Sequence, residues 1–297
     1  MGGRQGALEE LEVTAARGPA AGIVRIRARH PVVDWRELWE YRELFWFLVS
    51  RDIKTRHAQS ILGFGWVLAR PLFSVLVFVV IFGVLMKMPS DGTPYALFTF
   101  VALVPWGYFS VAVTKSADSL VTARGIISKV YYPRVLVPLT PVVAQLLDFT
   151  VALGFGLVMA AVFGYWPGSA FLLLPLLVVL MMATAVGLGL WLSALAVQYR
   201  DVRSVMPMAV QLMMYLAPVI WPLSLLEHKL GSHAELGRFL FGFYPMAGVV
   251  EGFRAAMLGS RAIPWDMLLS GTITAIVLLA SGLWFFSRRE PRFADVA

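Results

Sequence analysis

The sequence predicts an all-α membrane protein with six transmembrane helices, an amphipathic interfacial helix before them and a re-entrant outer segment before the last span. Hydrophobic residues make up 59% of the 297 positions and charged residues only 14%, whereas a soluble domain is about half apolar and a quarter charged. Mean hydropathy is +0.75. The apolar positions also gather in runs long enough to cross a bilayer as helices, which takes about 20 residues.

The N-terminal region is predicted to have two parts. Residues 1–33 are rich in Gly, Ala and Arg and lack an apolar core, so we expect a mobile tail and not a cleaved signal. Residues 34–60 predict an amphipathic helix in the cytoplasmic interface, with Asp34 as its cap and Glu37 in its first turn. Trp35, Leu38 and Trp39 share one face at headgroup depth. A soluble helix packed on another subunit is the alternative.

The membrane domain is predicted to occupy residues 61–290, followed by a cytoplasmic tail at 291–297. Six runs supply its spans: Ile61–Met86, Ala96–Thr114, an arm from about Val135 to the turn at 164–168, a second arm from that turn to Tyr199, Ser204–Leu226 and Met267–Ser287. Phe239–Val250 is apolar but too short to span. We therefore interpret the segment near 236–260 as re-entrant or interfacial.

The basic residues predict the orientation. Nineteen of the 25 Lys and Arg residues lie in 1–56, 115–134, 200–203 and 288–292, against five on the other side of the predicted spans. Because cytoplasmic segments of membrane proteins are enriched in Lys and Arg, we expect both termini in the cytoplasm. The net charge of +7 fits loops beside anionic lipid, so no nucleic-acid partner is expected.

Catalytic and metal-binding patterns are absent from the sequence. It has no cysteine, and its four histidines lie outside the predicted spans without metal-ligand spacing. There is no G-x-S-x-G nucleophile motif and no G-x-x-x-x-G-K-[ST] phosphate loop. Asp148 is the one carboxylate near the middle of a predicted span, which is too little for acid–base catalysis. We therefore expect neither an enzyme nor a metal site.

Four motifs carry a family resemblance: R-D-I-K-T-R-H-A-Q-S-I-L-G-F-G-W at 51–66, K-V-Y-Y-P-R-V-L-V-P at 129–138, A-V-Q-Y-R-D-V at 196–202 and Y-P-M-A-G-V-V-E-G-F-R at 244–254. In this order they resemble permease subunits of type-two ABC exporters, and more narrowly the branch that exports O-antigen, teichoic acid and related lipid-linked glycans. The resemblance covers roughly residues 35–290. His57 stands where that family usually has Tyr.

The resemblance implies a half-transporter in the bacterial cytoplasmic (inner) membrane. Two copies would form the pore, and two copies of a separate P-loop ATPase would bind the ATP and Mg²⁺, so this chain itself would hold no cofactor. The implied cargo is an undecaprenyl-linked polysaccharide. Alternatives are a type-two ABC permease for a drug or other small amphiphile and, from another class, a membrane glycosyltransferase or assembly scaffold.

The resemblance also implies a gate helix before the first span and a coupling helix near 123–138 that contacts the ATPase. The gate-helix aromatics are Trp35, Trp39, Tyr41 and Trp46. The coupling residues are Lys129, Val130, Tyr131, Tyr132, Pro133 and Arg134. Pro133 and Pro138 make this connection rigid, and Tyr and Arg are favoured interface anchors. An ordinary basic loop that touches lipid phosphates is the alternative.

The cargo path is predicted along spans one and five, which the resemblance places at the pore. Its candidate channel residues are Trp66, Phe73, Asp148, Tyr215 and Trp221, because aromatic faces and polar groups suit sugars. Candidate contacts for the carrier phosphate are Arg51, Lys54 and Arg70.

Each of these assignments has a structural alternative. Arg70 could extend to the lipid headgroups, and Asp148 could serve helix packing with Gln145 as its neighbour. Glu251 and Arg254, three residues apart on a helix, are expected to form a local ion pair. Trp106, Tyr108 and Trp265 are interpreted as lipid-facing or interfacial-belt aromatics.

Overall fold

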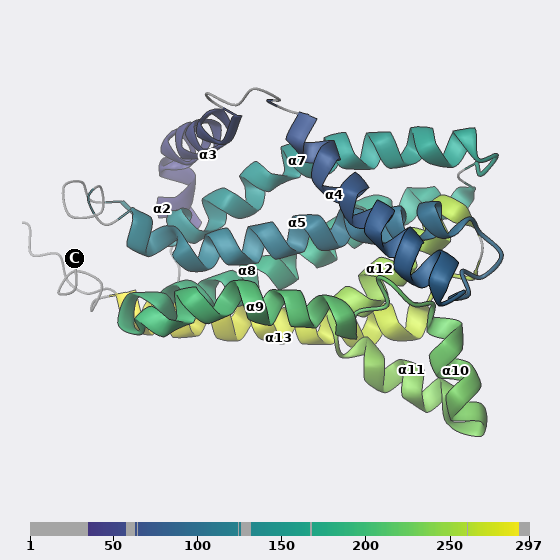
Figure 1. Ribbon diagram of the computed structural model, residues 1–297. Helices are drawn as coiled ribbons and strands as arrows, with labels where there is room; N and C mark the ends of the chain where they lie inside the picture. The colour runs from purple at the N-terminus through teal and green to yellow at the C-terminus, as the bar shows by residue number, and fades with distance from the viewer. Residues whose placement is uncertain are drawn as a thin grey trace, which may run out of the picture. The chain divides into compact units, whose positions relative to one another are not determined.

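The computed structural model describes residues 35–57, 63, 65–123, 125, 132–166, 168–259 and 261–290. The predicted tails at 1–33 and 291–297 lie outside this range. Every regular element in the described part is helical (Figure 1). The elements are α2 (Trp35–Glu40), α3 (Arg42–His57), α4 (Gly65–Phe78), the π-helix η1 (Val79–Leu85), α5 (Tyr95–Thr122), α7 (Leu136–Val162), η2 (Ser169–Leu173), α8 (Leu174–Gln198), α9 (Arg200–Leu216), α10 (Leu223–Leu230), η3 (Gly231–His233), α11 (Ala234–Gly242), α12 (Pro245–Leu258) and α13 (Trp265–Arg289).

Five helical segments are long and apolar enough to cross a membrane: Gly65–Leu85, Tyr95–Thr122, Leu136–Val162, Ser169–Gln198 and Trp265–Arg289. They correspond to the first, second, third, fourth and sixth predicted spans.

The remaining prediction, a span over Ser204–Leu226, differs from the structure. The helix there, α9, ends at Leu216 after 17 residues. Pro218 and Pro222 follow, and proline disfavours helix both at its own position and at the residue before it. Trp221 therefore lies beyond α9, in a linker that leads to α10.

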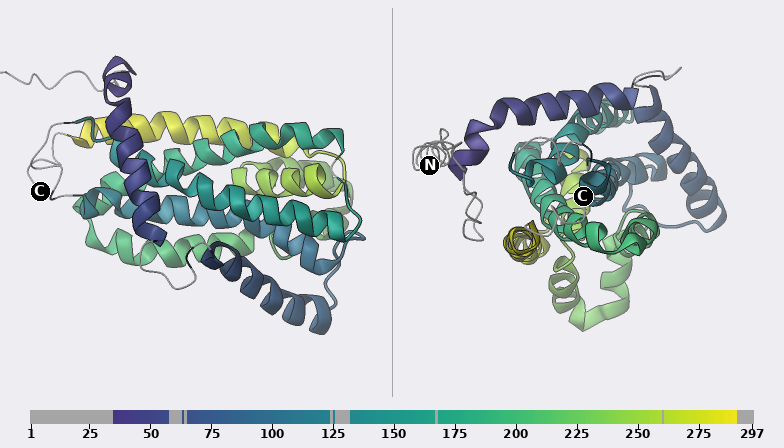
Figure 2. Two further views of the ribbon diagram at one scale, coloured as in Figure 1. Left: turned by 90° about the horizontal axis from the view of Figure 1, so that it is seen from above. Right: turned by 90° about the vertical axis from the view of Figure 1, so that its left-hand side faces the viewer.

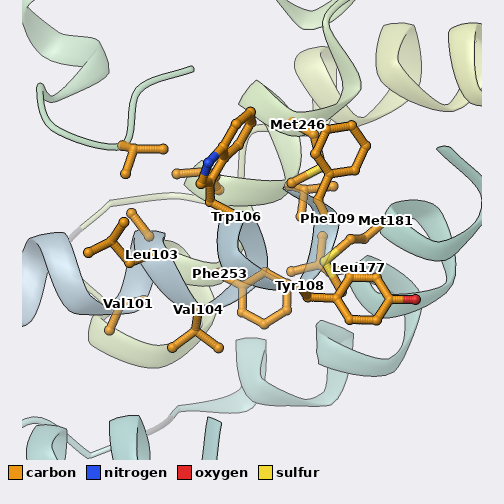
Figure 3. Packing of buried hydrophobic residues seen from close by; sticks show 14 of the residues in the cluster. Val101, Leu103, Val104, Trp106, Tyr108, Phe109, Leu177, Met181, Met246 and Phe253 are labelled. Atoms are coloured by element: carbon orange, nitrogen blue, oxygen red, sulfur yellow. The ribbon is translucent and has the colours of Figure 1, made fainter. Parts of the chain in front are cut away.

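Helix α5 is the centre of the bundle and packs against α4, α7, α8, α9 and α12. Figure 3 shows its Trp106, Tyr108 and Phe109 among side chains of α8 and α12. Trp106 is only 4% exposed and Tyr108 2%, so their interpretation as belt aromatics is wrong. The Tyr108 hydroxyl donates to the Val142 carbonyl of α7 over 2.9 Å. Trp265, in contrast, is about half exposed.

Helices α8 and α13 come into direct backbone contact at one glycine position of each helix. A Cβ atom on Gly187 would be 2.7 Å from the Leu278 carbonyl carbon, and one on Gly282 would be 2.6 Å from the Gly187 oxygen. Real Cβ atoms do not approach backbone so closely, so both positions require glycine. On the same face, Trp191 stacks on Phe285 at a centroid distance of 4.0 Å.

The bundle has two chemically distinct ends. We call one the basic end, where Arg203 pairs with Asp118, Arg289 bonds Gln198, and Arg134 donates to the Glu290 carbonyl. At the other, the distal end, Tyr165 donates to the Gly92 carbonyl over 3.3 Å, and the α10 hairpin meets the loop before α5. The segments that the Lys and Arg bias assigns to one side thus meet at one end.

The predicted interfacial helix forms α2 and α3, which part at Tyr41. In Figure 2 it crosses the long helices of the bundle instead of running along them. Leu38, Tyr41 and Leu44 pack on a cluster at the basic end, whereas Trp39 and Trp46 are exposed. Leu38 and Trp39 therefore lie in different surroundings, contrary to the predicted shared face. Trp35 begins α2.

The segment near 236–260 contains two helices and not one short run. Helix α11 pairs with α10 in a hairpin that projects from the bundle in Figure 1. Helix α12 is buried along its whole length between α5, α8 and α13. The chain changes direction at 243–244, where Pro245 begins α12, as proline often does in the first helical turn.

Candidate functional site

Two cavities adjoin α5 on the side of α3, α4 and α9. The first, the basic-end cavity, has a volume of about 750 Å³ and includes Arg51, Asp52, Tyr132 and Arg203 in its lining. The second, the lateral cavity, has a volume of about 840 Å³ and lies between α4, α5, α7 and α9. Lys115 lines both, so the two cavities adjoin at this residue.

A cluster of charged residues lies where the two cavities adjoin. Arg56 of α3 hydrogen-bonds both Asp52 and the Gln145 side chain of α7, and its Nη1 lies 3.6 Å from Asp148 Oδ2. The Arg56 side chain is only 10% exposed, so these contacts compensate for burying its charge. Asp148 therefore has Arg56 as its ionic partner. The same guanidinium also bonds Gln145, which lies one turn before Asp148 on α7.

The cavity linings carry an excess of positive charge. Their cations are Arg51, Arg56, Arg70, Lys115, Arg200 and Arg203, and their carboxylates are Asp52, Asp118 and Asp148. Three of the six cations could be balanced by these carboxylates. The remainder makes the combined site suitable for an anion, and Arg residues favour phosphate and carboxylate groups in particular.

The predicted phosphate-contact residues are not all together. Arg51 lines the basic-end cavity and Arg70 the lateral cavity, whereas Lys54 is exposed on α3 and lines neither. Arg56 and Lys115 were not predicted as site residues. Only tertiary structure could identify them, because α3 meets α7 about 90 residues further along the chain.

The predicted channel residues fall into separate places. Trp66 and Asp148 line the lateral cavity. Phe73 is largely exposed on α4, and Tyr215 is half exposed on α9. Trp221 lies at the distal end, where its Nε1 donates to the Tyr215 carbonyl over 3.2 Å and its ring contacts Phe241. Within one chain, therefore, these aromatics do not line a single path.

Of the predicted coupling residues, Lys129, Val130 and Tyr131 lie outside the described residues. Tyr132 is 5% exposed and packs in a cluster with Leu120 and Phe286. Burial raises the pKa of its phenol. Pro133 is half-buried, and Arg134 Nη1 donates to the Glu290 carbonyl oxygen over 2.7 Å. Burial also raises the pKa of the Glu290 carboxyl, opposed by Arg134. Both Tyr132 and Arg134 thus contact other helices of this chain.

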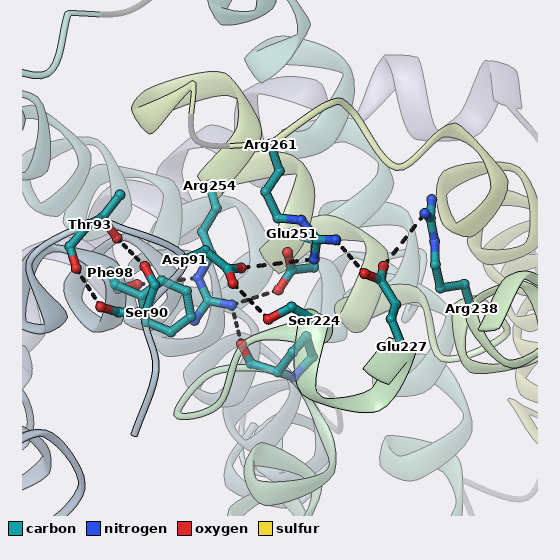
Figure 4. A network of polar contacts seen from close by, with 11 residues as sticks. Ser90, Asp91, Thr93, Phe98, Ser224, Glu227, Arg238, Glu251, Arg254 and Arg261 are labelled. Carbon is teal, nitrogen blue, oxygen red and sulfur yellow. Dashed lines mark hydrogen bonds and ion pairs between the residues drawn. The ribbon is translucent and has the colours of Figure 1, made fainter. Parts of the chain in front are cut away.

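A separate polar network lies at the distal end (Figure 4). The predicted Glu251–Arg254 pair forms at 2.6 Å, with both side chains buried. Arg254 also contacts the backbone of α5 and of the linker after α9. Among the described residues, no group of three or more His, Asp or Glu side chains is placed to hold a metal ion.

Comparison with known proteins identifies the class of this architecture. Residues 43–258 match the ABC-2 type transporter family. An O-antigen export system permease protein, RfbA, from Myxococcus xanthus is 29% identical over 260 residues, which cover 88% of this chain and 97% of the relative.

Two further relatives are similar over comparable lengths. RfbA from Klebsiella pneumoniae is 24% identical, with 86% of this chain and 95% of the relative covered. The capsule polysaccharide export inner-membrane protein CtrC from Neisseria meningitidis is 26% identical, with 90% of this chain and all of the relative covered. The family match covers most of the helical bundle and both cavities. The chain therefore belongs to the ABC-2 type transporter family and is a membrane-embedded transporter permease, not an enzyme.

Proposed function

We propose that this chain is the permease subunit of an ATP-driven exporter that moves undecaprenyl-linked polysaccharide across the bacterial inner membrane. The observation that carries this proposal is the pair of cation-rich cavities that meet at Lys115. A carrier lipid with a phosphate-bearing headgroup supplies the negative charge that these cavities lack. The relatives, which export O-antigen and capsule polysaccharide, support the cargo class.

The motor is a separate ATPase, because the sequence has no phosphate-binding loop. It binds ATP and Mg²⁺ and docks at the basic end, on the connection between α5 and α7. Two copies of this chain and two ATPase chains make the full transporter. The exposed apolar stripes of α4 and α9 are available to the second copy and to lipid.

Six spans with both termini in the cytoplasm require α9 as the fifth span. At about 1.5 Å per residue, its 17 residues reach about 25 Å, less than the hydrocarbon thickness of about 30 Å. The linker 217–222 completes the crossing. Non-helical backbone is tolerated at such depth only where protein surrounds it, and Ala217, Val219 and Ile220 are buried. Helices α11 and α12 then form the re-entrant outer segment.

Helices α2 and α3 lie in the cytoplasmic interface. Their crosswise course (Figure 2) and the exposed indoles of Trp39 and Trp46 support this placement. Because Arg56 joins α3 to α7 between the cavities, movement of α3 opens a continuous passage past Lys115. The interfacial helix thereby acts as a gate for the carrier headgroup.

The cargo test compares cations that differ in position. Export of lipid-linked polysaccharide is measured in vesicles containing the permease and its ATPase. We expect Lys115→Gln and Arg70→Gln to reduce export strongly. Lys54→Gln is the matched control, because it removes the same charge outside both cavities. Equal effects of Lys54→Gln and Lys115→Gln would show that surface charge, and not the cavity, matters.

Topology is tested with single cysteines, which can be placed freely because the chain has none. An impermeant thiol reagent is expected to label Ser232→Cys from outside the cell, but neither Ser128→Cys nor Ser287→Cys. Labelling of position 287 from outside would exclude six spans with a cytoplasmic C-terminus.

A further inference from the structure

The outer face of α13 is an apolar stripe that ends in a cation. Its exposed apolar side chains recur about every four residues along the helix and include Leu269, Ile273, Val277 and Trp284. Arg288, one turn after Trp284, is the next exposed residue. Figure 2 shows α13 and α4 on opposite sides of the bundle, so this stripe lies away from the α4 stripe that is available to the second copy. Because α13 is long and apolar enough to cross the membrane, lipid acyl chains cover it.

Arg288 has N–H donors that the described residues leave unused. Its guanidinium carbon lies 4.9 Å from the Trp284 ring centroid, which is a cation–π contact. In the described part of the chain, no acceptor hydrogen-bonds this guanidinium and no carboxylate pairs with it. Arginine carries five N–H donors in a planar fork that suits phosphate oxygens. Arg288 therefore lies over an exposed indole with its donors available to a phosphate.

The next residue, Arg289, is held in place by rings from two helices. Its guanidinium carbon lies 5.0 Å from the Phe285 ring centroid, and Phe285 stacks on Trp191 of α8 at 4.0 Å. Trp191 in turn donates from Nε1 to Ser281 Oγ over 3.1 Å. Arg289 Nη1 bonds the Gln198 side chain at the end of α8. These contacts fix the second guanidinium where α8 and α13 end.

The charge of the two arginines is not balanced by the residues that the structure describes. Arg203 at the same end pairs with Asp118, whereas neither Arg288 nor Arg289 forms an ion pair there. The macrodipole of α13 favours basic residues in its last turn, but it does not require a ring beneath each of them. Rings that hold both guanidinium groups lower the entropy cost of binding a phosphate. The two arginines thus form a preorganised anion site beside an apolar stripe.

We propose that α8 and α13, where they terminate at the basic end, bind one anionic phospholipid of the surrounding bilayer. Its phosphate lies at Arg288 and Arg289, and its acyl chains follow the outer stripe of α13 past Trp284. Two arginines without a carboxylate favour a headgroup of net negative charge, such as that of phosphatidylglycerol, because basic clusters at the membrane surface attract anionic lipids. Phosphatidylcholine also carries a phosphate, but its choline cation meets the same arginines.

The bound lipid also affects the connection between α5 and α7. Glu290, which follows Arg289, accepts at its backbone carbonyl the Arg134 hydrogen bond that fastens this connection. A phosphate held by the two preceding arginines stabilises the last turn of α13 and keeps this acceptor in place. We therefore expect more export per ATP hydrolysed when anionic phospholipid is present. This consequence rests on the proposed function, whereas the lipid site itself does not.

Lipid binding is measured with a fluorophore on the outer stripe. Ala280→Cys places the only cysteine of the chain at an exposed position one turn before Trp284, where an attached fluorophore contacts acyl chains. The labelled protein is reconstituted in phosphatidylcholine bilayers. Part of the host lipid is then replaced by phosphatidylglycerol or phosphatidylcholine that carries a nitroxide quencher on an acyl chain. We expect phosphatidylglycerol to reach half-maximal quenching at a mole fraction at least about fivefold lower, from the contribution of each basic residue near an anionic lipid.

Variants of the cation assign this preference. Arg288→Gln, which loses no polar contact with the described residues, is expected to reduce the preference for phosphatidylglycerol about fivefold. Arg288→Lys keeps the charge and is expected to retain most of it. Lys54→Gln is the matched control, because it removes an exposed positive charge from α3 and leaves the outer stripe of α13 unchanged. Equal quenching by both lipids in the parent, or equal losses in Arg288→Gln and Lys54→Gln, overturns the proposal.

A competition experiment distinguishes phospholipid from the carrier. Unlabelled phosphatidylglycerol is expected to relieve the quenching, and undecaprenyl phosphate to need a higher mole fraction. Relief by undecaprenyl phosphate at a lower mole fraction assigns this surface to the carrier and overturns the phospholipid site. None of these measurements uses the ATPase or polysaccharide, so a reconstituted transporter that exports no polysaccharide contradicts only the proposed function. Export per ATP that is the same with and without phosphatidylglycerol contradicts the effect on the connection between α5 and α7.

Discussion

The two ends of the bundle are fastened by different kinds of contact. At the distal end, buried side chains bind backbone carbonyl groups, and Arg254 alone joins two helices and a linker. At the basic end, the connection into α7 is held by the Tyr132 ring and by one Arg134 hydrogen bond, beside an open cavity. In the described part of the connection where we place the ATPase, the attachments are thus a packed ring and a single hydrogen bond, so a displacement there meets less resistance than one at the distal linker.

The largest expected loss of stability comes from removing Arg254 at the distal end. Arg254→Ala removes its carbonyl contacts and leaves Glu251 buried without its cation, which costs about 3–5 kcal/mol of stability. Thermal unfolding in detergent measures this loss. The double variant Arg254→Ala/Glu251→Ala should be less destabilised than the single one, because no lone buried carboxylate remains. A double variant that is far worse than the single one would contradict this account.

At the basic end, Tyr132→Ala should create a cavity among Leu120, Val135 and Phe286, with a cost of about 3 kcal/mol. It should also reduce the export achieved per ATP hydrolysed, because the loop loses one of its attachments to the bundle. Tyr132→Phe keeps the ring and should keep the coupling. Coupling lost equally in both variants would point to the hydroxyl group and a direct contact with the ATPase.

A smaller effect is expected at Arg134. Arg134→Ala loses a hydrogen bond from a charged donor, which contributes about 1.5–3 kcal/mol. Its acceptor is the Glu290 backbone carbonyl, so Glu290→Gln should leave this bond in place and retain coupling. The ratio of ATP hydrolysis to export measures the difference between the two variants. Identical losses would indicate that the Glu290 carboxylate carries the interaction.

The smallest effect on stability is expected at exposed aromatic side chains of α4 and α9. Phe73→Ala and Tyr215→Ala alter exposed side chains and should change stability by about 0.5 kcal/mol or less while slowing export. Trp106→Ala, in the core, should cost about 3–5 kcal/mol. Unfolding temperature and export rate, measured on all three, separate the two classes. If Phe73→Ala unfolds as early as Trp106→Ala, α4 is packed more tightly than its exposure indicates.

The sequence contained enough information for most helices, because spanning runs and the Lys and Arg bias are local signals. Five of the six predicted spans coincide with helices that are long and apolar enough to cross a membrane, and the basic segments meet at one end as expected. The sequence could not predict that Trp106 and Tyr108 are buried, since helix faces that contact lipid and helix faces that contact protein are both apolar in composition. The sequence analysis also missed the end of α9 at Leu216, although Pro218 two residues later could have indicated it.

The candidate site was less predictable from sequence. Arg51 and Arg70 were identified as basic residues near the first span, but Arg56 and Lys115 acquire their place only when α3 crosses α7 and the cavities form around α5. Tyr132 and Arg134 were interpreted as anchors for a partner, because interface and interior favour the same residue types. Contacts within the chain show where their side chains lie. The docking of the ATPase on this loop stays a prediction.

The glycine contact between α8 and α13 has a practical consequence for measuring motion in this protein. Because backbone meets backbone at Gly187 and Gly282, neither helix can slide or rotate on the other without a steric clash. Spin labels on the outward faces of these two helices should keep the same separation in every step of the transport cycle. The distance between labels on these two helices is therefore a constant reference, with which displacements of α3, α9 and α10 can be compared in a single sample.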